Sequence, residues 1–333
     1  MCPEGTNLVL QFDRSPDYFF RSGVYDNFKC YVAEEEGRIV GTATTTLKHF
    51  WLSGEVLNSV YIRDLRVHPK FRRRNIGSKL VQHATVEEQN ADLAYALVME
   101  DNTPSAGLFQ NLGYNRIRDL TLWTVPLYKR SKTTQGTIRE MTGEDLPKVV
   151  ELINDYYNNY DFFTPICEDE FADRIIRLRK YGLRNMLVAE SEEGIVACAG
   201  LWDYSYILRP SVLRLRMNLR ILSRVLRILN LFTNAPKLPA VGELFKLTYA
   251  VNFAHAKGSL TQLENLLDYC LALSEGYRSH FLCFPLDASD PRKTLIRKHQ
   301  AIPVKYQIYV RSLKARTAIC RSEVMTYADP LDF

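Results

Sequence analysis

The chain has 333 residues, of which 46% are hydrophobic and 24% are charged, and its formal net charge is +5. This length exceeds that of a typical single domain and allows an ample core, and the composition excludes disordered and fibrous proteins. The mild positive charge permits an acidic ligand but does not indicate nucleic acid as a partner.

The first predicted elements form a β-hairpin. Residues 8–12 are a short candidate strand, and little chain follows before the hairpin begins. Residues 28–34 and 38–47 have strand-like composition, and a turn at residues 35–37 joins them. Residues 48–58 then lead back to the next strand.

A strand, a basic loop and a helix follow, and the first half is arranged around them. The β-branched and aromatic run at residues 61–67 ends before Pro69, three consecutive arginines follow, and apolar residues recur with helical spacing from Ile76. The first N–H groups of such a helix have no intrahelical partner, and its dipole is positive there, so the loop is a candidate anion site. Asn75 and Gly77 tolerate unusual backbone angles and let a ligand come close.

The pattern Arg72-x-x-Asn75-x-Gly77, behind Leu65-x-Val67-x-Pro69, resembles the coenzyme-A loop of the GNAT N-acetyltransferase superfamily. The usual form of that loop is Gln/Arg-x-x-Gly-x-Gly/Ala. The departure is Asn75, and asparagine is the residue other than glycine that most readily adopts a left-handed conformation.

A second signature lies downstream and resembles the same family. Residues 93–99 are a predicted strand, Asn102 opens a predicted helix, and this helix ends in Leu112-Gly113-Tyr114. The resemblance implies a GNAT domain of α/β (α+β) class at residues 1–126, with an intact CoA loop and a mixed central sheet flanked by helices. Its start is short for the family, so either the acceptor-side helices are trimmed or the true N-terminus lies upstream.

The resemblance also implies the cofactor, acetyl-CoA, and the residues that bind it. Backbone N–H groups of the loop would hold the pyrophosphate, its arginines would add charge-assisted contacts, and the pantetheine would pair with the backbone of the preceding strand. The cofactor contacts expected on this basis are Leu65, Arg66, Val67, Arg72, Arg73, Arg74, Asn75, Ile76, Gly77, Ser78, Asn102 and Phe109.

Acetyl transfer to an amine requires a neutral nucleophile, and therefore a general base for a lysine-like acceptor. We expect Asp64 or Glu100 in this role, ahead of Asp101 and Tyr61. The alternative for Asp64 is a structural carboxylate that pairs with Arg63 or Arg66. His68 lies beside the loop, but a lone histidine before a proline is typical of a surface residue.

Phe109 is the clearest departure from the family pattern. Many GNAT enzymes have a tyrosine there that protonates the leaving sulfur, which phenylalanine cannot do. Three outcomes stay open: a slower enzyme, protonation by water or by another hydroxyl such as that of Tyr95 or Tyr114, or no catalysis.

The second half repeats the same plan after a polar, basic linker at residues 127–136. We expect residues 137–333 to be a second GNAT-like domain, and its organising strand, residues 244–251, lacks the arginine and glycine pattern behind it. This copy is therefore expected to be degenerate. Its predicted elements are a strand and helix at residues 137–157, a hairpin at 186–202, strands at 281–286 and 305–313, and a helix at 290–299.

A basic helical insertion at residues 209–236 interrupts the second half. Arg216, Arg220, Arg224 and Arg227 share one helical face. One interpretation is an amphipathic helix that docks on an anionic membrane, nucleic acid or another acidic partner. The alternative is that its apolar side packs on the domain and its arginines are solvated or paired.

The remaining features bear on location and function. Seven scattered cysteines without a Cys-x-x-Cys pair favour neither disulfides nor a metal site, and we expect a cytoplasmic protein. No apolar run reaches the length of a membrane span. We expect an acetyl-CoA-dependent N-acetyltransferase that acts directly on a primary amine of a small molecule or protein. The alternative is a non-catalytic acyl-CoA-binding or interaction protein on the same fold.

Overall fold

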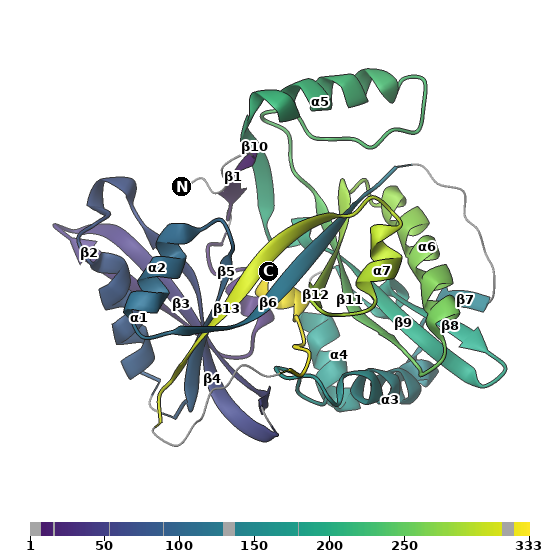
Figure 1. The fold of residues 1–333 in the computed structure, drawn as a ribbon, viewed down its shortest axis with the longest axis horizontal. Coiled ribbons are helices and arrows are strands. Elements are labelled where there is room, and N and C mark those ends of the chain that lie inside the picture. The colour runs from purple at the N-terminus through teal and green to yellow at the C-terminus, as the bar shows by residue number, and fades with distance from the viewer. Residues whose placement is uncertain are drawn as a thin grey trace.

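The computed structural model describes residues 8–15, 17–52, 54–88, 90–128, 137–178, 180–314 and 323–333. A mixed 11-stranded sheet runs through both halves, with helices packed against it (Figure 1). The first half contains β1 (Leu8–Asp13), β2 (Phe28–Glu35), β3 (Arg38–Leu52), β4 (Glu55–Val67), α1 (Ile76–Val86), β5 (Leu93–Met99), α2 (Thr103–Asn111) and β6 (Asn115–Pro126). The second half contains β7 (Thr137–Glu140), α3 (Leu146–Tyr157), α4 (Glu168–Arg177), β8 (Met186–Ser191), β9 (Gly194–Asp203), β10 (Arg209–Leu215), α5 (Met217–Leu229), β11 (Leu247–His255), α6 (Leu260–Gly276), β12 (Phe281–Asp287), α7 (Lys293–Arg297) and β13 (Ile302–Ser312).

The first half follows the order predicted from its motifs. β2 and β3 form the expected hairpin, β4 is the strand before the basic loop, and α1 begins at Ile76 as predicted. Asn102 is the N-cap of α2, and its side chain accepts a hydrogen bond from the N–H of Ser105. Helix α1 connects β4 to the parallel strand β5 and packs on β3 and β4.

The second half repeats this arrangement. β8 and β9 form the expected hairpin, and α6 connects β11 to the parallel strand β12, as α1 connects β4 to β5. The two organising strands share an irregularity: Asp64 in β4 and Asn252 in β11 have positive φ angles of 50° and 52°, and each lies at a shift in strand register. The chain therefore consists of two halves of the same architecture.

The two halves exchange strands, which the sequence did not predict. We expected the strand at residues 305–313 to complete the second half, but β13 pairs with β5 of the first half. Conversely, β6 of the first half pairs with β12 of the second, and β6 and β13 also pair with each other. The sheet order is β2-β3-β4-β5-β13-β6-β12-β11-β9-β8-β7, so β13 and β6 join the halves at the centre of Figure 1.

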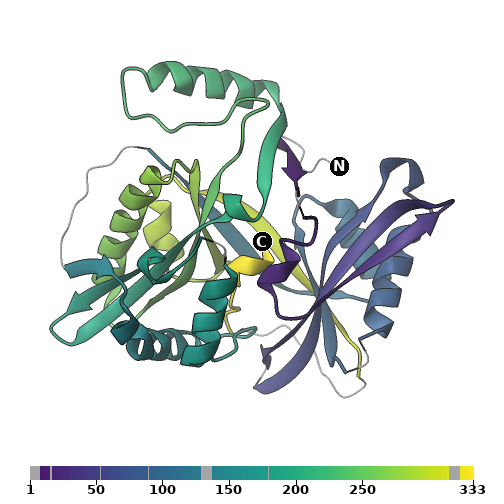
Figure 2. The ribbon, with the colours of Figure 1, turned by 180° about the vertical axis from the view of Figure 1, so that it is seen from behind.

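The basic insertion expected at residues 209–236 is helical only in part. Its first part is strand β10, which pairs antiparallel with β1 in a separate two-stranded sheet, and the helix α5 begins only at Met217. Pro210 cannot donate a backbone hydrogen bond, which suits a short strand at the margin of the fold. Both views show α5 at the periphery, reached through β10 (Figures 1 and 2).

The C-terminal segment lies between the halves. Tyr25 of the first half donates a hydrogen bond to the carbonyl oxygen of Leu331 at 2.6 Å, and Arg174 of α4 pairs with Asp329 at 2.6 Å. A single large group of buried residues draws on both halves and on Leu331 and Phe333. Of the linker expected at residues 127–136, only the first two residues lie within the described part of the chain.

Candidate functional site

Strands β4 and β5 separate to form a notch. They pair only where Ser59, Val60 and Tyr61 lie beside Leu93, Ala94 and Tyr95. Beyond this point β4 still pairs with β3, and β5 pairs with β13. The backbone of residues 62–67 therefore has one edge that β5 does not occupy, which suits an extended ligand that pairs like an added strand.

The basic loop leads from the end of β4 to the start of α1. Asn75 is the N-cap of α1 and adopts the predicted left-handed conformation, with φ of 59° and ψ of 13°. Arg73 also has a positive φ, 64°. The N–H groups of the first turn of α1 point away from the helix and have no intrahelical acceptor, so they form a candidate site for a phosphate group.

The three loop arginines are exposed and differ in their contacts. Nε of Arg72 donates to the carbonyl oxygen of Val67 at 3.2 Å, which fixes the loop against the end of β4. Arg74 forms an exposed ion pair with Glu35 at 3.0 Å. Cofactor binding by this loop stays a prediction, with the backbone N–H groups and Arg73 as candidate donors. His68 is exposed, as expected.

Gly77 does not adopt the unusual backbone angle that the sequence suggested, and its contact with a cofactor stays a prediction. It lies inside α1, where its backbone conformation is available to any residue. A Cβ atom at this position would lie 2.9 Å from Cδ1 of Leu108 in α2. Glycine therefore makes room for the side chain of Leu108, which would have to move to admit a Cβ atom.

A cavity of about 650 Å³ continues from the notch to the space between the halves. Its notch end is formed by residues 62–66 of β4, residues 96–99 of β5, and Asn102, Ser105 and Phe109. Its opposite end is largely apolar and draws on β1, β10, α5, β6, β11, β12 and β13. The apolar side chains there are Leu8, Leu10, Phe12, Leu122, Leu208, Leu215, Leu219, Leu222, Leu238, Phe245, Leu247, Phe281, Ile302 and Val304.

Asp64 lies on the cavity wall among four arginines. Its side chain is 2% exposed and pairs with Arg14 and with Arg21, the latter at 3.4 Å. Arg63 and Arg66 are more distant, at 3.6 and 3.9 Å. Burial would raise the pKa of Asp64, but the surrounding guanidinium groups outweigh burial and hold the pKa well below its usual range. This environment favours the structural alternative, because such a carboxylate accepts protons poorly.

Glu100 is far more exposed than a buried base would be. Its side chain is 48% exposed, and it pairs with Lys305 of β13 at 3.4 Å. It does not line the cavity, whereas the neighbouring Asp101 does. The geometry therefore does not favour Glu100 as the base either.

Phe109 is buried in α2 and lines the notch end of the cavity. Neither Tyr95 nor Tyr114, the two residues considered in its place, lines the cavity. The Tyr114 hydroxyl hydrogen-bonds to Thr85 at 3.2 Å, and the Tyr95 hydroxyl donates to Asp332 at 3.3 Å. A tyrosine proton donor at the leaving sulfur is therefore not evident among these residues.

Asp332 is a cavity carboxylate that sequence reasoning missed. Lys48 donates to its Oδ1 at 2.6 Å, and the Tyr25 hydroxyl donates to the same atom at 3.0 Å. Burial raises the pKa of Asp332 above its usual value, the nearby carboxylate of Asp329 raises it further, and Lys48 opposes both without reversing the direction. Asp332 belongs to no motif, and only the path of the C-terminal segment brings it to the cavity.

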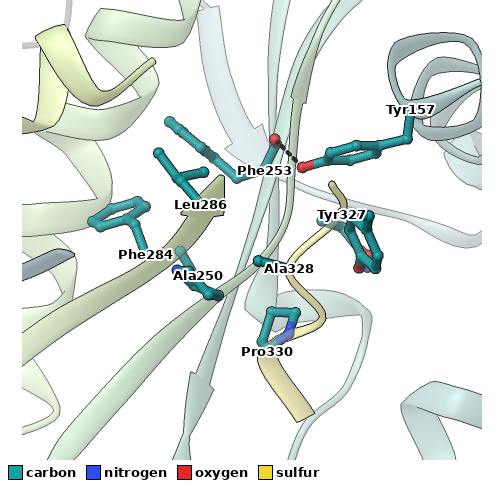
Figure 3. Close-up of a pocket in the computed structure, with 10 residues that line it drawn as sticks. Tyr157, Ala250, Phe253, Phe284, Leu286, Tyr327, Ala328 and Pro330 are labelled. Carbon is teal, nitrogen blue, oxygen red and sulfur yellow. Dashed lines mark hydrogen bonds between the residues drawn. The ribbon is translucent and has the colours of Figure 1, made fainter. Parts of the chain in front are cut away.

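The corresponding notch of the second half is filled. β11 and β12 pair only near Leu247–Tyr249 and then separate, but the cavity there is only about 10 Å³, room for about one water molecule. Tyr327, Ala328 and Pro330 of the C-terminal segment close it (Figure 3). The Tyr157 hydroxyl donates to the carbonyl oxygen of Phe253 at 2.8 Å, as Figure 3 shows.

A buried arginine completes this filled notch. Arg292 is 2% exposed, donates to the same carbonyl oxygen of Phe253, and pairs with Asp290 at 2.6 Å. The β11 edge that would receive a pantetheine chain is thus occupied by side chains. This agrees with the degenerate second copy expected from its missing loop.

Comparison with known proteins bears on the fold and the family. Residues 6–114 match the family model described as acetyltransferase (GNAT) family. The crystal structure of Saccharomyces cerevisiae N-myristoyltransferase with bound myristoyl-CoA is similar, with a TM-score of 0.63 and 14% identity over 95% of this chain and 80% of that chain. A GCN5-related N-acetyltransferase from Sphaerobacter thermophilus has a TM-score of 0.59 and 14% identity over 87% of this chain and 82% of that chain. No curated protein matches the sequence. The predicted α/β architecture with two GNAT-like halves is confirmed.

Proposed function

Because residues 6–114 form a domain of the GNAT acetyltransferase family, we propose that the chain transfers an acyl group from acyl-CoA directly to an amine. The cofactor binds at the notch of the first half, with its pyrophosphate at the N-terminus of α1 and its pantetheine along residues 62–67. The second half binds no cofactor and forms the far wall of the acceptor site. The cavity that continues from the notch to the second half carries this proposal.

The size of the cavity bears on the acyl group. The sequence led us to expect acetyl-CoA, but the cavity of about 650 Å³ continues past the notch, where the pantetheine would lie, into the apolar space between the halves. The wall beyond the notch is mostly aliphatic, and burial of each methylene group contributes ~0.8 kcal/mol. The similar N-myristoyltransferase structure contains bound myristoyl-CoA. We therefore propose a long-chain acyl donor in preference to acetyl-CoA.

The polar wall of the cavity suits the amine. Tyr61, Asp64, Arg66 and Asp332 line this side, whereas the acyl chain would occupy the apolar side. The amine nitrogen attacks the thioester carbonyl carbon, the carbon–sulfur bond breaks, and CoA leaves as its thiolate. We propose that Asp332 accepts the proton that the amine loses, because its raised pKa makes it a better base than Asp64.

The leaving thiolate does not need a tyrosine donor. A thiol with an ordinary pKa near ~8.5 leaves adequately as its anion, so Phe109 slows the reaction without preventing it. Phe109 also favours the alternative function, a non-catalytic acyl-CoA-binding protein, because it cannot protonate the leaving sulfur. The two functions differ in one observable, the release of free thiol in the presence of an amine.

Thiol release from acyl-CoAs, from acetyl to palmitoyl, against a panel of primary amines tests the proposal. We expect release with at least one amine and the highest rate with a long chain. Ser78→Glu should abolish binding and turnover, because it places a negative charge at the phosphate site while favouring the helix N-terminus. Val86→Glu, at the opposite end of α1, is the matched control and should bind normally. Tight binding without thiol release on the whole panel would establish the binding protein instead.

A further inference from the structure

Helix α5 presents an apolar stripe to solvent. Met217, Ile221, Val225 and Ile228 recur at helical spacing and are 65%, 54%, 46% and 59% exposed. Leu231 and Phe232 follow the helix and are 77% and 83% exposed. The apolar residues of this helix therefore do not all pack on the domain, whereas Arg227 pairs with Glu243 at 3.0 Å, as the alternative interpretation expected.

A different side of α5 faces the protein. Ser223 is buried, and its hydroxyl donates to the carbonyl oxygen of Leu238 at 3.2 Å. Leu219, Leu222 and Ser223 line the cavity together with Leu215 of β10. The helix is thus one wall of the cavity, and it lies at the periphery in both views (Figures 1 and 2).

The charge around the stripe is mostly positive, although Arg227 pairs with the exposed carboxylate of Glu243 at 3.0 Å. Arg220, Arg224 and Arg227 form a row beside the apolar stripe on the helix surface. Residues 209–242 contain no aspartate or glutamate. Their cationic residues are Arg209, Arg214, Arg216, Arg220, Arg224, Arg227 and Lys237.

We propose that α5 docks on the surface of an anionic lipid bilayer. Exposed apolar side chains beside a row of arginines are the features of a helix that lies in a membrane interface, with apolar side chains among the acyl chains and arginines at the lipid phosphates. A second copy of this chain fits less well, because it would bring two segments of net positive charge together. Nucleic acid would contact the arginines but would leave the apolar stripe in water.

Docking places the apolar end of the cavity near the bilayer, with α5 and the segment that follows it between them. A long acyl chain, or an amine with a lipid tail, can then pass to the cavity without crossing water. This route for the acyl chain rests on the proposed function, whereas docking on vesicles is measured without turnover. Failure of the docking is therefore distinguishable from failure of the proposed acyl transfer.

Co-sedimentation of the full chain with vesicles tests the docking. Vesicles of phosphatidylcholine alone and of phosphatidylcholine with phosphatidylglycerol are compared at low and high salt. We expect at least tenfold stronger binding to the anionic vesicles, weakening with salt. Because each arginine near an anionic surface contributes roughly fivefold in affinity, Arg220→Glu with Arg224→Glu should lose about 25-fold or more.

A second pair of variants tests the apolar stripe. Ile221→Glu with Ile228→Glu should abolish binding to anionic vesicles. Ile176→Glu is the matched control, because Ile176 is 77% exposed on α4 and should not touch the membrane. Urea unfolding shows whether each variant is folded. The proposal would be overturned if the unmodified chain did not bind vesicles, or if Ile176→Glu lost as much binding as the stripe variant. It would also be overturned if light scattering showed that the stripe variant loses only a dimer of the chain and keeps its vesicle binding.

Discussion

Replacement of Asp64 by asparagine distinguishes a structural carboxylate from a catalytic one. Asp64 is 2% exposed and is surrounded by four guanidinium groups, of which those of Arg21, Arg63 and Arg66 lie 3.4, 3.6 and 3.9 Å from its oxygens. Each pair at this distance is worth ~4–5 kcal/mol at an effective dielectric constant near ~20, before the cost of desolvation. The neutral amide of the variant would leave the guanidinium groups without this negative charge.

The expected loss follows from these contacts. Removal of one member of a buried ion pair typically costs ~3–5 kcal/mol, and we expect a loss of this size in the free energy of unfolding. Because the pKa of Asp64 is lowered in the folded state, its contribution is present above the usual pKa of 3.8 and is lost as the pH falls. Urea unfolding of Asp64→Asn at neutral and acidic pH measures both effects.

Glu100→Gln is the matched control for this variant. Its partner Lys305 is exposed at the surface, and such pairs contribute little, so we expect a change below ~1 kcal/mol. A change below ~1 kcal/mol in Asp64→Asn as well, together with lost turnover and intact acyl-CoA binding, would refute the structural account. Asp64 would then be the base that the sequence suggested.

Three further predictions concern the helix contact, the filled notch and the base. Gly107→Ala in α2, where a Cβ meets nothing within 4 Å, should be more stable in urea unfolding than Gly77→Ala by ~1 kcal/mol, because a Cβ at Gly77 would lie 2.9 Å from Cδ1 of Leu108 and displace it. Equal changes in the two variants would contradict this contact. Arg292→Met should lower the free energy of unfolding by ~3–5 kcal/mol, because Asp290 stays buried without its partner. The variant should bind acyl-CoA as the unmodified chain does, and weakened binding would place the cofactor in the second notch. Turnover should fall as the pH drops through the raised pKa of Asp332, because the base must be ionised. Asp332→Asn should lower kcat by ~10²–10⁴ and remove this fall at acidic pH. An unchanged pH profile of kcat in the variant would exclude Asp332 as the base.

The local elements around the loop were predictable because their signals are local. Asn75 could be assigned a left-handed conformation from its residue type and position, and α1 begins at Ile76 as its periodicity predicted. The hairpins were found from strand composition and turn residues. These features depend on neighbours in sequence, which a single chain displays directly.

The long-range pairing could not be predicted in this way. Strand composition shows that β13 is a strand but not that it pairs with β5 rather than with strands of its own half. The same limit applies to the role of Gly77, which depends on Leu108 of another helix. Asp332 reaches the cavity only because the C-terminal segment passes between the halves.

The exposure of α5 was also beyond local reasoning. The sequence indicated a basic amphipathic helix, but its periodicity is the same whether the apolar stripe faces the protein or solvent. The structure decides which side of the helix faces solvent: Ser223 is buried toward the domain, and Met217 and Ile228 are exposed on the opposite side.

Calorimetric titration of decanoyl-CoA and of acetyl-CoA into the full chain tests the central claim, a single acyl-CoA site at the notch of the first half that opens into an apolar cavity. We predict one bound molecule per chain, and at least ~100-fold tighter binding of decanoyl-CoA because its added methylene groups are buried. Two molecules per chain, equal affinity for the two thioesters, or absence of binding would contradict the account.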